Sequence, residues 1–290
     1  MTDKQFFPLT LVSNVEGEDN TLAHFTTQLP RDISLDGEWS VGLSEIQYTK
    51  SWFNINKYYA VGIKDDQSIT YQSPEKLVPG VYDSPADLIR EINRCVEKAS
   101  VSVVNGRTRN QAASNLKHMD EYKCPKLEYN MNSRRVSLKA GKAQDGRKLY
   151  VTLDYELKEM LGMTRDDEMY NNEFNDLDHV ILEINQELVK GEQDALFVYD
   201  LHCGIHNLMV YCDLIKPIIT GDTYTQLLRA VPVSHRKFGD QICVTFTKPY
   251  FFPLASNNFR SIEISIRDDT GSLIPFKFGR TVVVLEFRKL

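Results

Sequence analysis

Apolar and polar residues alternate with a period of two through the C-terminal part of the chain. Ile262, Ile264 and Ile266 are separated by polar residues such as Glu263, and Arg267 follows. Successive side chains of a strand point to opposite faces, so this pattern predicts a strand with the three isoleucines buried and Glu263 and Arg267 in solvent. The pattern recurs at Ile242, Val244 and Phe246, and at Val283, Leu285 and Phe287, where Glu286 and Arg288 face outward.

Turn-rich segments separate these strands and a further one predicted at Leu227 to Val233. Short strands at regular spacing, joined by polar turns, are typical of a β-sandwich or barrel. The N-terminal part predicts three more strands, at Phe6 to Val12, Leu22 to Gln28 and Trp39 to Tyr48. In the last of these the apolar phase slips by one residue near Ser44 and Glu45, which indicates a β-bulge.

The middle of the chain has a different pattern. Ser84, Pro85 and Asp87 form an N-terminal capping signal before a run with helical spacing, which predicts a helix from Pro85 to about Lys98. A polar loop is expected from Val104 to Asn115. The remaining expected elements are a hairpin of Lys126 to Asn130 and Arg135 to Lys139, strands at Leu149 to Leu153, Ala195 to Tyr199 and Leu208 to Leu214, and a short helix from Tyr155 to Leu161, capped by Asp154 and ended by Gly162.

These patterns predict a mainly β protein with an α+β, β-rich domain inserted into a β-sandwich. We expect residues 1–58 and 218–290 to supply the strands of the sandwich and residues 59–217 to form the inserted domain. The first and last strands then belong to one core, although the insertion separates them in sequence.

Composition narrows the class of protein. The 290 residues include 40 acids and 34 Lys and Arg, so the net charge of -6 disfavours general nucleic-acid coating. Hydrophobic residues make up 42% and charged residues 26%, as in ordinary folded domains. The sequence predicts neither a signal peptide nor a membrane-inserted segment, because its apolar runs are too short. Its five cysteines, Cys95, Cys124, Cys203, Cys212 and Cys243, are expected to be free thiols that pack as small core residues.

Charge is unevenly distributed within the expected insertion. Lys123 to Lys148 contains eight bases and two acids, whereas Asp154 to Asp194 contains thirteen acids and three bases. These segments can be two solvated faces, or complementary edges that meet between the subunits of a ring. Specific nucleic-acid binding is not expected, because Tyr129 is the only aromatic residue on the basic hairpin and stacking needs more.

Two clusters invite a chemical interpretation. Asp269-Thr270-Gly271-Ser272 matches the nucleophilic turn of aspartic proteases, but it occurs once and follows the charged Arg267 and Asp268, so a hairpin turn is favoured. His202, Cys203, His206 and Cys212 could hold zinc in principle, but no Cys-x-x-Cys pair accompanies them.

Nucleophile-elbow and phosphate-loop motifs do not occur, and the acidic run Asp166 to Glu168 lacks the spacing of a calcium loop. We therefore expect no catalytic, cofactor-binding or metal-binding residues and no enzyme activity. The sequence does not identify the residues of any subunit interface.

The two ends of the chain resemble a known family, and shorter matches lie between them. The N-terminal block comprises Asn20 to Leu22, Phe25 to Pro30 and Leu35 to Tyr48. The C-terminal block comprises Tyr250 to Leu254, Phe259 to Ile264, Asp268 to Gly271, Ile274 to Phe276, Gly279 and Val284 to Arg288. The shorter matches are Leu161 to Met163, Val210 to Leu214 and Leu227 to Arg229. Together these segments resemble the minor capsid (penton) proteins of Polinton (Maverick) elements, adintoviruses and related virophages.

This resemblance implies a jelly-roll protein without cofactors, located in the virion and assembled in the nucleus or cytoplasm of a host cell. It implies that five copies form a homo-pentamer at each icosahedral vertex, beside trimers of a double jelly-roll major capsid protein. The inserted domain would project and could meet a host surface receptor. A carbohydrate- or receptor-binding β-sandwich, as a monomer or trimer, is the main alternative, and a dimeric aspartic protease is the remote one.

Overall fold

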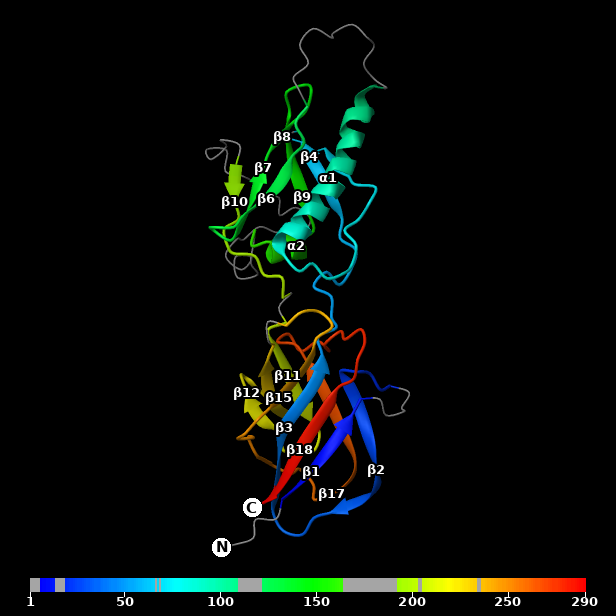
Figure 1. The fold of residues 1–290 in the computed structure, drawn as a ribbon, viewed down its shortest axis with the longest axis vertical. Coiled ribbons are helices and arrows are strands. Elements are labelled where there is room, and N and C mark those ends of the chain that lie inside the picture. Colours follow the sequence, from blue (N-terminus) through cyan, green and yellow to red (C-terminus); the bar gives the residue numbers. More distant parts are fainter. Residues whose placement is uncertain are drawn as a thin grey trace. The chain divides into compact units, whose positions relative to one another are not determined.

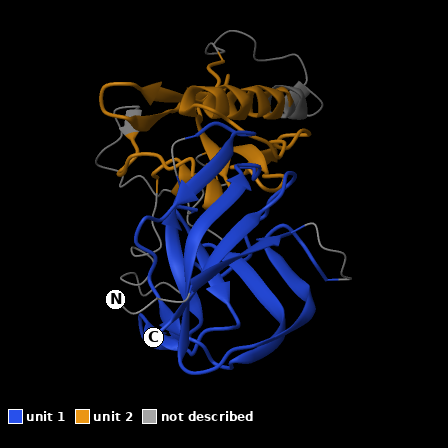
Figure 2. Ribbon diagram, turned by 60° about the horizontal axis from the view of Figure 1, so that its bottom comes forward, with its two compact units in different colours: residues 1–53, 204–290 blue, residues 54–203 orange. Residues whose placement is uncertain are grey.

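The computed structural model describes residues 6–13, 19–65, 67, 69–108, 122–163, 192–202, 205–233 and 236–290. The chain divides into two compact units: unit 1 comprises Met1–Phe53 and Gly204–Leu290, and unit 2 comprises Asn54–Cys203 (Figure 2). Unit 2 is thus inserted into the sequence of unit 1. The sequence predicts the edges of the insertion after residues 58 and 217, whereas the structure has them after residues 53 and 203. The difference is larger at the second edge, because the strand at Asn207–Cys212 pairs with strands of unit 1.

Unit 1 is built from two antiparallel sheets (Figure 1). The first has the order β1 (Phe6–Val12), β18 (Val282–Lys289), β3 (Trp39–Thr49) and β15 (Gln241–Thr245), and β16 (Phe252–Pro253) also pairs with β3. The second has the order β14 (Leu227–Pro232), β11 (Asn207–Cys212), β17 (Asn258–Arg267) and β2 (His24–Ser34).

This order identifies the fold of unit 1 as a jelly roll. If its eight main strands are counted along the chain, one sheet has the order first, eighth, third, sixth and the other has fifth, fourth, seventh, second. That interleaving of early and late strands is the double Greek key of a jelly roll. Unit 2 is inserted between the third and fourth strands, so the predicted jelly-roll sandwich with an inserted α+β domain is confirmed.

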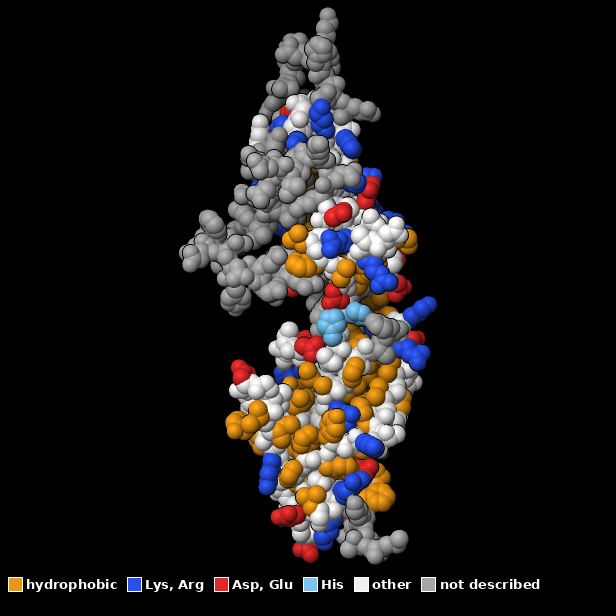
Figure 3. Space-filling model, turned by 90° about the vertical axis from the view of Figure 1, so that its left-hand side faces the viewer, with side chains coloured by type: hydrophobic (Ala, Val, Ile, Leu, Met, Phe, Trp, Pro, Cys, Tyr) orange, Lys and Arg blue, Asp and Glu red, His pale blue; other side chains and the backbone are white. Residues whose placement is uncertain are grey.

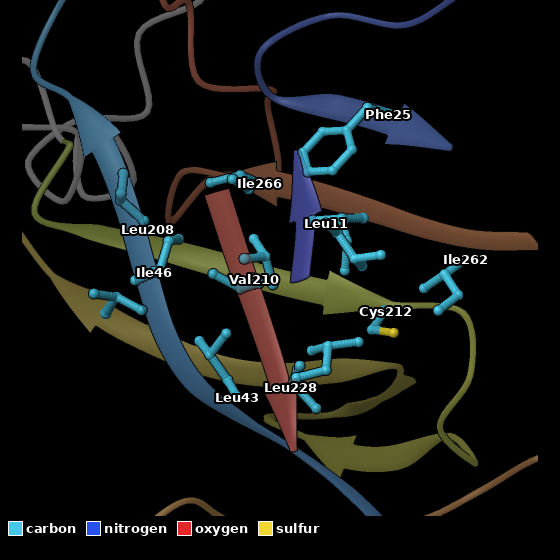
Figure 4. Close-up of a cluster of buried hydrophobic side chains, with 14 of the residues drawn as sticks. Leu11, Phe25, Leu43, Ile46, Leu208, Val210, Cys212, Leu228, Ile262 and Ile266 are labelled. Carbon is cyan, nitrogen blue, oxygen red and sulfur yellow. The ribbon is translucent and has the colours of Figure 1, made fainter. Parts of the chain in front are cut away.

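The core of unit 1 lies between the two sheets and is formed by the inward side chains of both (Figure 4). Ile262, Ile264 and Ile266 are fully buried and Glu263 is exposed, as the alternation predicts, while Arg267 is half-buried. Leu43, Ile46 and Tyr48 are also buried despite the change of phase between them. Strands from both ends of the chain supply side chains to this one core, which therefore holds the two ends together.

The predicted bulge in β3 is confirmed. Leu43 pairs with Leu285 and Glu45 pairs with Val284, so Ser44 is the additional residue of β3. The Ser44 hydroxyl donates a hydrogen bond of 2.9 Å to the carbonyl oxygen of Val284. The bulge therefore explains how both apolar phases of this strand reach the same core.

Strand β2 is longer than predicted, because it continues through Pro30 to Ser34. Proline lacks the backbone N–H needed on both sides of a central strand. In this sheet β2 is an edge strand, and Pro30 lies where the register with β17 shifts, between the Gln28–Ser261 and Ile33–Phe259 pairs. An edge position and an interrupted register thus allow the strand to continue past its predicted end at Gln28.

Unit 2 combines two sheets with two helices (Figure 1). The strands of one sheet are, in order, β5 (Thr70–Gln72), β4 (Val61–Asp65), β9 (Lys148–Leu153) and β8 (Gly141–Lys142), and those of the other are β10 (Glu192–Asp194), β7 (Arg135–Lys139) and β6 (Lys126–Asn130). The helices are α1 (Pro85–Thr108) and α2 (Tyr155–Met160).

Helix α1 begins at the predicted residue but ends later, so residues 104–108 are helical instead of part of a loop. At its start Ser84 Oγ accepts a hydrogen bond from Asp87 N and donates one to Asp87 Oδ2. The first bond satisfies one of the backbone donors that a helix start leaves free, and the second holds the two side chains together. The buried face of α1 carries Leu88, Ile89, Ile92, Cys95, Val96 and Ala99 and belongs to the core of unit 2.

The segment after β10 is not the strand predicted at Ala195 to Tyr199. Its backbone N–H groups donate to other elements instead: Phe197 N to Gly162 O at 2.9 Å and Asp200 N to Met160 O at 2.8 Å. Gly162 ends α2 with a φ of 74°, and a Cβ there would lie 2.4 Å from Phe197 O. The predicted glycine stop is confirmed, whereas Asp154 makes no side-chain capping bond and instead accepts one from Ala60 N.

Candidate assembly surface on unit 1

The Asp-Asp-Thr-Gly segment forms the predicted hairpin turn. Asp268 Oδ1 accepts hydrogen bonds from the backbone N–H groups of Thr270 and Ser272, each 2.9 Å long, and Gly271 has a φ of 86°. Asp269 is exposed, and its Oδ1 accepts a bond of 3.2 Å from Asn207 Nδ2. A protease aspartate shares a proton with a second carboxyl in a protected site. An exposed turn position does not provide those surroundings.

Of the four residues considered for zinc, the three that the structure describes, His202, His206 and Cys212, are not grouped as a metal site. Cys212 is buried in the unit 1 core, where burial raises the pKa of its thiol to about 12. His206 is exposed before β11, and His202 belongs to unit 2. Cys203 lies outside the described residues. Among the residues that the structure does describe, no three His, Cys, Asp or Glu side chains are grouped to hold a metal ion.

The other cysteines follow the prediction in part. Cys95, Cys124, Cys212 and Cys243 are free thiols. Cys95 and Cys212 are buried, whereas Cys243 is exposed on β15. The prediction of a core position is therefore wrong for Cys243, because it lies on the outward face of an alternating strand.

Over the described part of the chain, no helix is long and apolar enough to span a membrane.

Much of the basic charge on Lys123 to Lys148 is compensated within unit 2. Arg147 is buried and forms ion pairs with Asp65 and Asp145, and Glu128 pairs with both Lys126 and Lys139. Buried charges need such partners, since desolvation is costly. The acidic run Asp166 to Glu168, like most of the segment to Asp194, lies outside the described residues. Complementary edges between subunits stay a prediction.

On unit 1, one edge of the sandwich carries an arginine whose guanidinium contacts two aromatic rings. Arg229 projects from β14, and its guanidinium carbon lies 3.9 Å from the ring centroid of Phe246 and 4.2 Å from that of Tyr250. Phe246 directly follows β15, so the three side chains connect the edge strands of the two sheets. Contact with aromatic faces stabilises the cation and fixes the orientation of the guanidinium plane.

The backbone geometry beside this cluster depends on a glycine. A Cβ on Gly42 of β3 would lie 2.4 Å from the carbonyl oxygen of Tyr250. Any larger residue would therefore displace the segment that carries Tyr250. The side chain of Tyr250 is exposed, so the ring lies against Arg229 on one face of the molecule and is accessible from outside.

A second arginine–aromatic pair lies on the same sheet as Gly42. The guanidinium carbon of Arg288 on β18 is 4.1 Å from the ring centroid of Phe251, and Arg288 Nη2 donates to Glu286 Oε1 at 3.1 Å. Arg288 thus has a carboxylate partner. Arg229 differs from it in having no ion pair with any described residue.

Unit 1 also exposes large apolar side chains. The hairpin of β12 (Ile218–Thr220) and β13 (Thr223–Thr225) belongs to unit 1, and Ile219 and Tyr224 pair across it while exposing 69% and 73% of their surface. Figure 3 shows hydrophobic side chains gathered on the side of unit 1 where β12 lies in Figure 1. Such patches are typical of contact surfaces.

Sequence reasoning did not single out these residues as a site. Arg229 and Tyr250 belong to segments that carry the family resemblance, but they are far apart in sequence and in no motif. Their contact depends on the approach of β14 to the segment after β15, which local periodicity does not report. The one signal in the sequence that could have indicated this site was Arg229 itself, a charged residue within the otherwise apolar strand predicted at Leu227 to Val233.

Comparisons with known proteins give no family assignment by sequence. No family model matches the chain, and no curated protein matches it. Among solved structures, it is similar to the mavirus penton protein with a TM-score of 0.49 and 13% sequence identity, over 99% of this chain and 100% of that chain. It is also similar to a chain of the Sputnik virophage structure with a TM-score of 0.45 and 14% identity, over 98% of each.

Proposed function

We propose that this chain is a penton, or minor capsid, protein of the kind found in Polinton (Maverick) elements, adintoviruses and virophages. Five copies would form a homo-pentamer at each vertex of an icosahedral virion, beside a double jelly-roll major capsid protein. In this role the protein is structural, and the transposon-derived element that encodes it would make virions in a host cell.

One observation carries the proposal. The two blocks of sequence that resemble the family are far apart in the chain, yet they pair with each other in unit 1. Strand β3 of the N-terminal block pairs with β18 of the C-terminal block, and β2 pairs with β17. The resemblance therefore falls on one jelly roll, an architecture common in capsid proteins.

Unit 2 supports the proposal in a different way. It is an insertion between two strands of the jelly roll and has its own hydrophobic core. An insertion with its own core can vary without disturbing the assembling domain. We propose that unit 2 meets a host surface receptor, while unit 1 makes the contacts of the capsid.

The mass of the protein in solution tests the proposal. Native mass spectrometry at high protein concentration and low salt should show pentamers, or pentamers should form once a double jelly-roll major capsid protein is added. Added salt should weaken contacts that depend on charge. A stable trimer under both conditions would contradict the proposal and favour the carbohydrate- or receptor-binding sandwich.

A further inference from the structure

We propose that three loops at one end of unit 1 bind a sulfated polysaccharide. The loops are residues 50–53, 236–240 and 275–281, and together they form the basic end of unit 1. The inference goes beyond the proposed function, because it assigns a ligand that does not depend on the number of subunits.

The register of the first sheet brings the three loops together. The first loop follows β3, and the other two precede β15 and β18, which are the neighbours of β3. Gln241 pairs with Thr49 and Val282 pairs with Gln47, so the end of β3 lies beside the starts of β15 and β18. Segments far apart in sequence therefore meet at one end of the sheet.

Hydrogen bonds fix the three loops to one another. The backbone N–H of Lys50 donates to Asp240 O at 3.0 Å. The hydroxyl of the buried Ser51 donates to Phe278 O at 2.7 Å and accepts a bond of 3.2 Å from Lys277 N. The backbone of the basic end is therefore already ordered, which reduces the entropy lost when a ligand binds.

The basic end carries an excess of positive charge. Its loops contain one acid, Asp240, and five cations, which are Lys50, Arg236, Lys237, Lys277 and Arg280. All of these cations except Lys50 are exposed, and none of the exposed four forms an ion pair with a described residue. The whole chain has a net charge of -6, so this excess is local. An uncompensated positive cluster of this kind favours an anionic ligand.

The acids of the preceding turn are engaged elsewhere. Asp268 accepts hydrogen bonds from the backbone N–H groups of Thr270 and Ser272 within the turn. Asp269 accepts one from Asn207 at the start of β11. Neither aspartate forms an ion pair with a described residue. The positive charge of the basic end is therefore not neutralised by these acids.

Three phenylalanine rings lie among the cations. The ring centroids of Phe53 and Phe238 are 5.8 Å apart, and those of Phe238 and Phe278 are 5.5 Å apart. Lys277 Nζ lies 5.2 Å from the centroid of Phe53. Phe53 and Phe238 are half-buried, whereas Phe278 exposes 47% of its surface. A ligand at the basic end therefore meets cations beside one accessible apolar ring.

These features define the chemistry of the ligand. Sulfate groups keep their negative charge at every physiological pH and accept hydrogen bonds from ammonium and guanidinium groups. A sugar ring also has an apolar C–H face, which can cover Phe278 and remove its ring from water. A sulfated polysaccharide combines both features in one narrow, flexible chain.

Nucleic acid matches the basic end less well. A single strand binds through bases that stack on successive aromatic faces, but only Phe278 of the three rings is well exposed. A duplex carries its phosphates over a broad rod, so it needs a broad basic face, and the net charge of -6 opposes its approach to the rest of the chain. A narrow polyanion without bases is therefore favoured.

Heparin is the probe that tests the inference on the intact chain. Its affinity is measured by titration calorimetry at a series of salt concentrations. Lys237→Gln and Lys277→Gln should each weaken binding about three- to fivefold, because each removes one exposed ionic contact. Each should also reduce the slope of log K against log salt by about one. Phe278→Ala should weaken binding but keep the slope, since it removes an apolar contact only.

Lys216→Gln is the matched control. Lys216 is exposed, its backbone N–H donates to Pro253 O at 3.1 Å, and Pro253 pairs with Ser40 at the start of β3. Lys216 therefore lies at the opposite end of β3 from the basic end, and its substitution should change neither the affinity nor the slope. Lys237→Arg keeps the charge and should retain binding. Desulfated heparin should bind at least tenfold more weakly than heparin.

The outcomes separate this inference from the proposed function. Wild-type affinity and slope in both lysine variants, or undiminished binding of desulfated heparin, would overturn the inference. Tighter binding of an oligonucleotide than of heparin through the same lysines would also overturn it and assign the basic end to nucleic acid. Native mass spectrometry of the same samples reports assembly. Pentamers that do not bind heparin would overturn the ligand and leave the function intact, whereas stable trimers that bind it through these lysines would support the ligand and contradict the function.

Discussion

At the scale of single residues, Asp268 and Asp269 show how neighbouring acids take different roles. Asp268 Oδ1 accepts three hydrogen bonds, including one of 2.7 Å from Thr270 Oγ1, and so stabilises the turn. Asp269 faces solvent and meets Asn207. Asp269, the aspartate of the protease-like motif, thus has a smaller structural role than Asp268.

Substitution should separate the two aspartates. Asp268→Ala removes an acceptor of three bonds and should lower the unfolding free energy by about 1–3 kcal/mol. Asp269→Asn keeps the accepting oxygen and should change it by less than about 0.5 kcal/mol, with assembly intact. Urea unfolding measures both. Cleavage of an unfolded polypeptide between about pH 4 and 7 that disappears in Asp269→Asn would instead support the dimeric protease.

A second residue-scale feature is Glu75, which connects the β5–α1 segment to the helix. Its carboxylate pairs with Arg94, at 2.7 Å, and with Lys98. The hydrogen bond from Lys98 is the main cause that lowers the pKa of Glu75 below its ordinary 4.5, and Arg94 adds to it against partial desolvation. The ionised form is therefore favoured in the folded protein.

The sign of the pH dependence follows from linkage. A carboxyl whose pKa is lower in the folded state contributes stability above pH 4.5, and this contribution is lost as the pH falls through the lowered value. Glu75→Gln should reduce the stability of unit 2 at neutral pH and flatten its acid dependence over that window. Thermal unfolding at a series of pH values measures this. The exposed Glu97→Gln is the matched control, and equal profiles for both variants would contradict the assignment.

At the scale of elements, α1 and β6 are joined by a side chain that replaces a neighbouring strand. Asn93 Nδ2 donates to Leu127 O and Asn93 Oδ1 accepts from Leu127 N, each at 2.9 Å. Strand β6 is an edge of its sheet, so this pair of backbone groups points away from β7. The amide protects an edge that could otherwise pair with another chain. A groove of about 940 Å³ lies beside it, lined by residues of α1 and β6.

Removing this amide should expose the edge. Asn93→Ala leaves two backbone groups of Leu127 without a partner and should destabilise unit 2 by about 1–3 kcal/mol. The amide of Leu127 should exchange faster with deuterium, as hydrogen-exchange mass spectrometry would show. Asn132→Ala, at the exposed tip of the β6–β7 hairpin, is the comparison and should leave this exchange unchanged.

At the scale of the whole molecule, the chain has two separate hydrophobic cores. The core of unit 1 contains Ile264 and that of unit 2 contains Ile92, both fully buried, and the two clusters share no residue. Units with separate cores can unfold independently. The assignment of the chain to two domains is therefore open to a direct thermodynamic test.

Calorimetry should resolve two unfolding transitions. Ile264→Ala should lower the stability of unit 1 by about 2–5 kcal/mol, and Ile92→Ala should do the same for unit 2, because each leaves a cavity in one core. Ile219→Ala removes the same atoms from an exposed position and should change stability by less than about 0.5 kcal/mol. A single transition shifted equally by both core variants would contradict independent units.

The sequence by itself determined which faces of the main strands are buried. Side chains of a strand alternate between its two faces whatever the strand pairs with. The burial of the β17 isoleucines and the change of phase in β3 could therefore be predicted from the sequence. The start of α1, the β6–β7 hairpin and the Asp-Gly turn were equally local, because capping and turn chemistry involve residues within a few positions. The resemblance of the two ends also implied that they form one domain.

Only the tertiary structure decided what depends on partners distant in sequence. The position of β2 at a sheet edge allows Pro30 within a strand, and the pairing of β11 assigns it to unit 1. The rings around Arg229 come from segments that periodicity treats separately. Periodicity reports the exposure of each side chain but not its neighbours across sheets. The jelly-roll strand order and the contacts of Arg229 with these rings could therefore be known only from the tertiary structure.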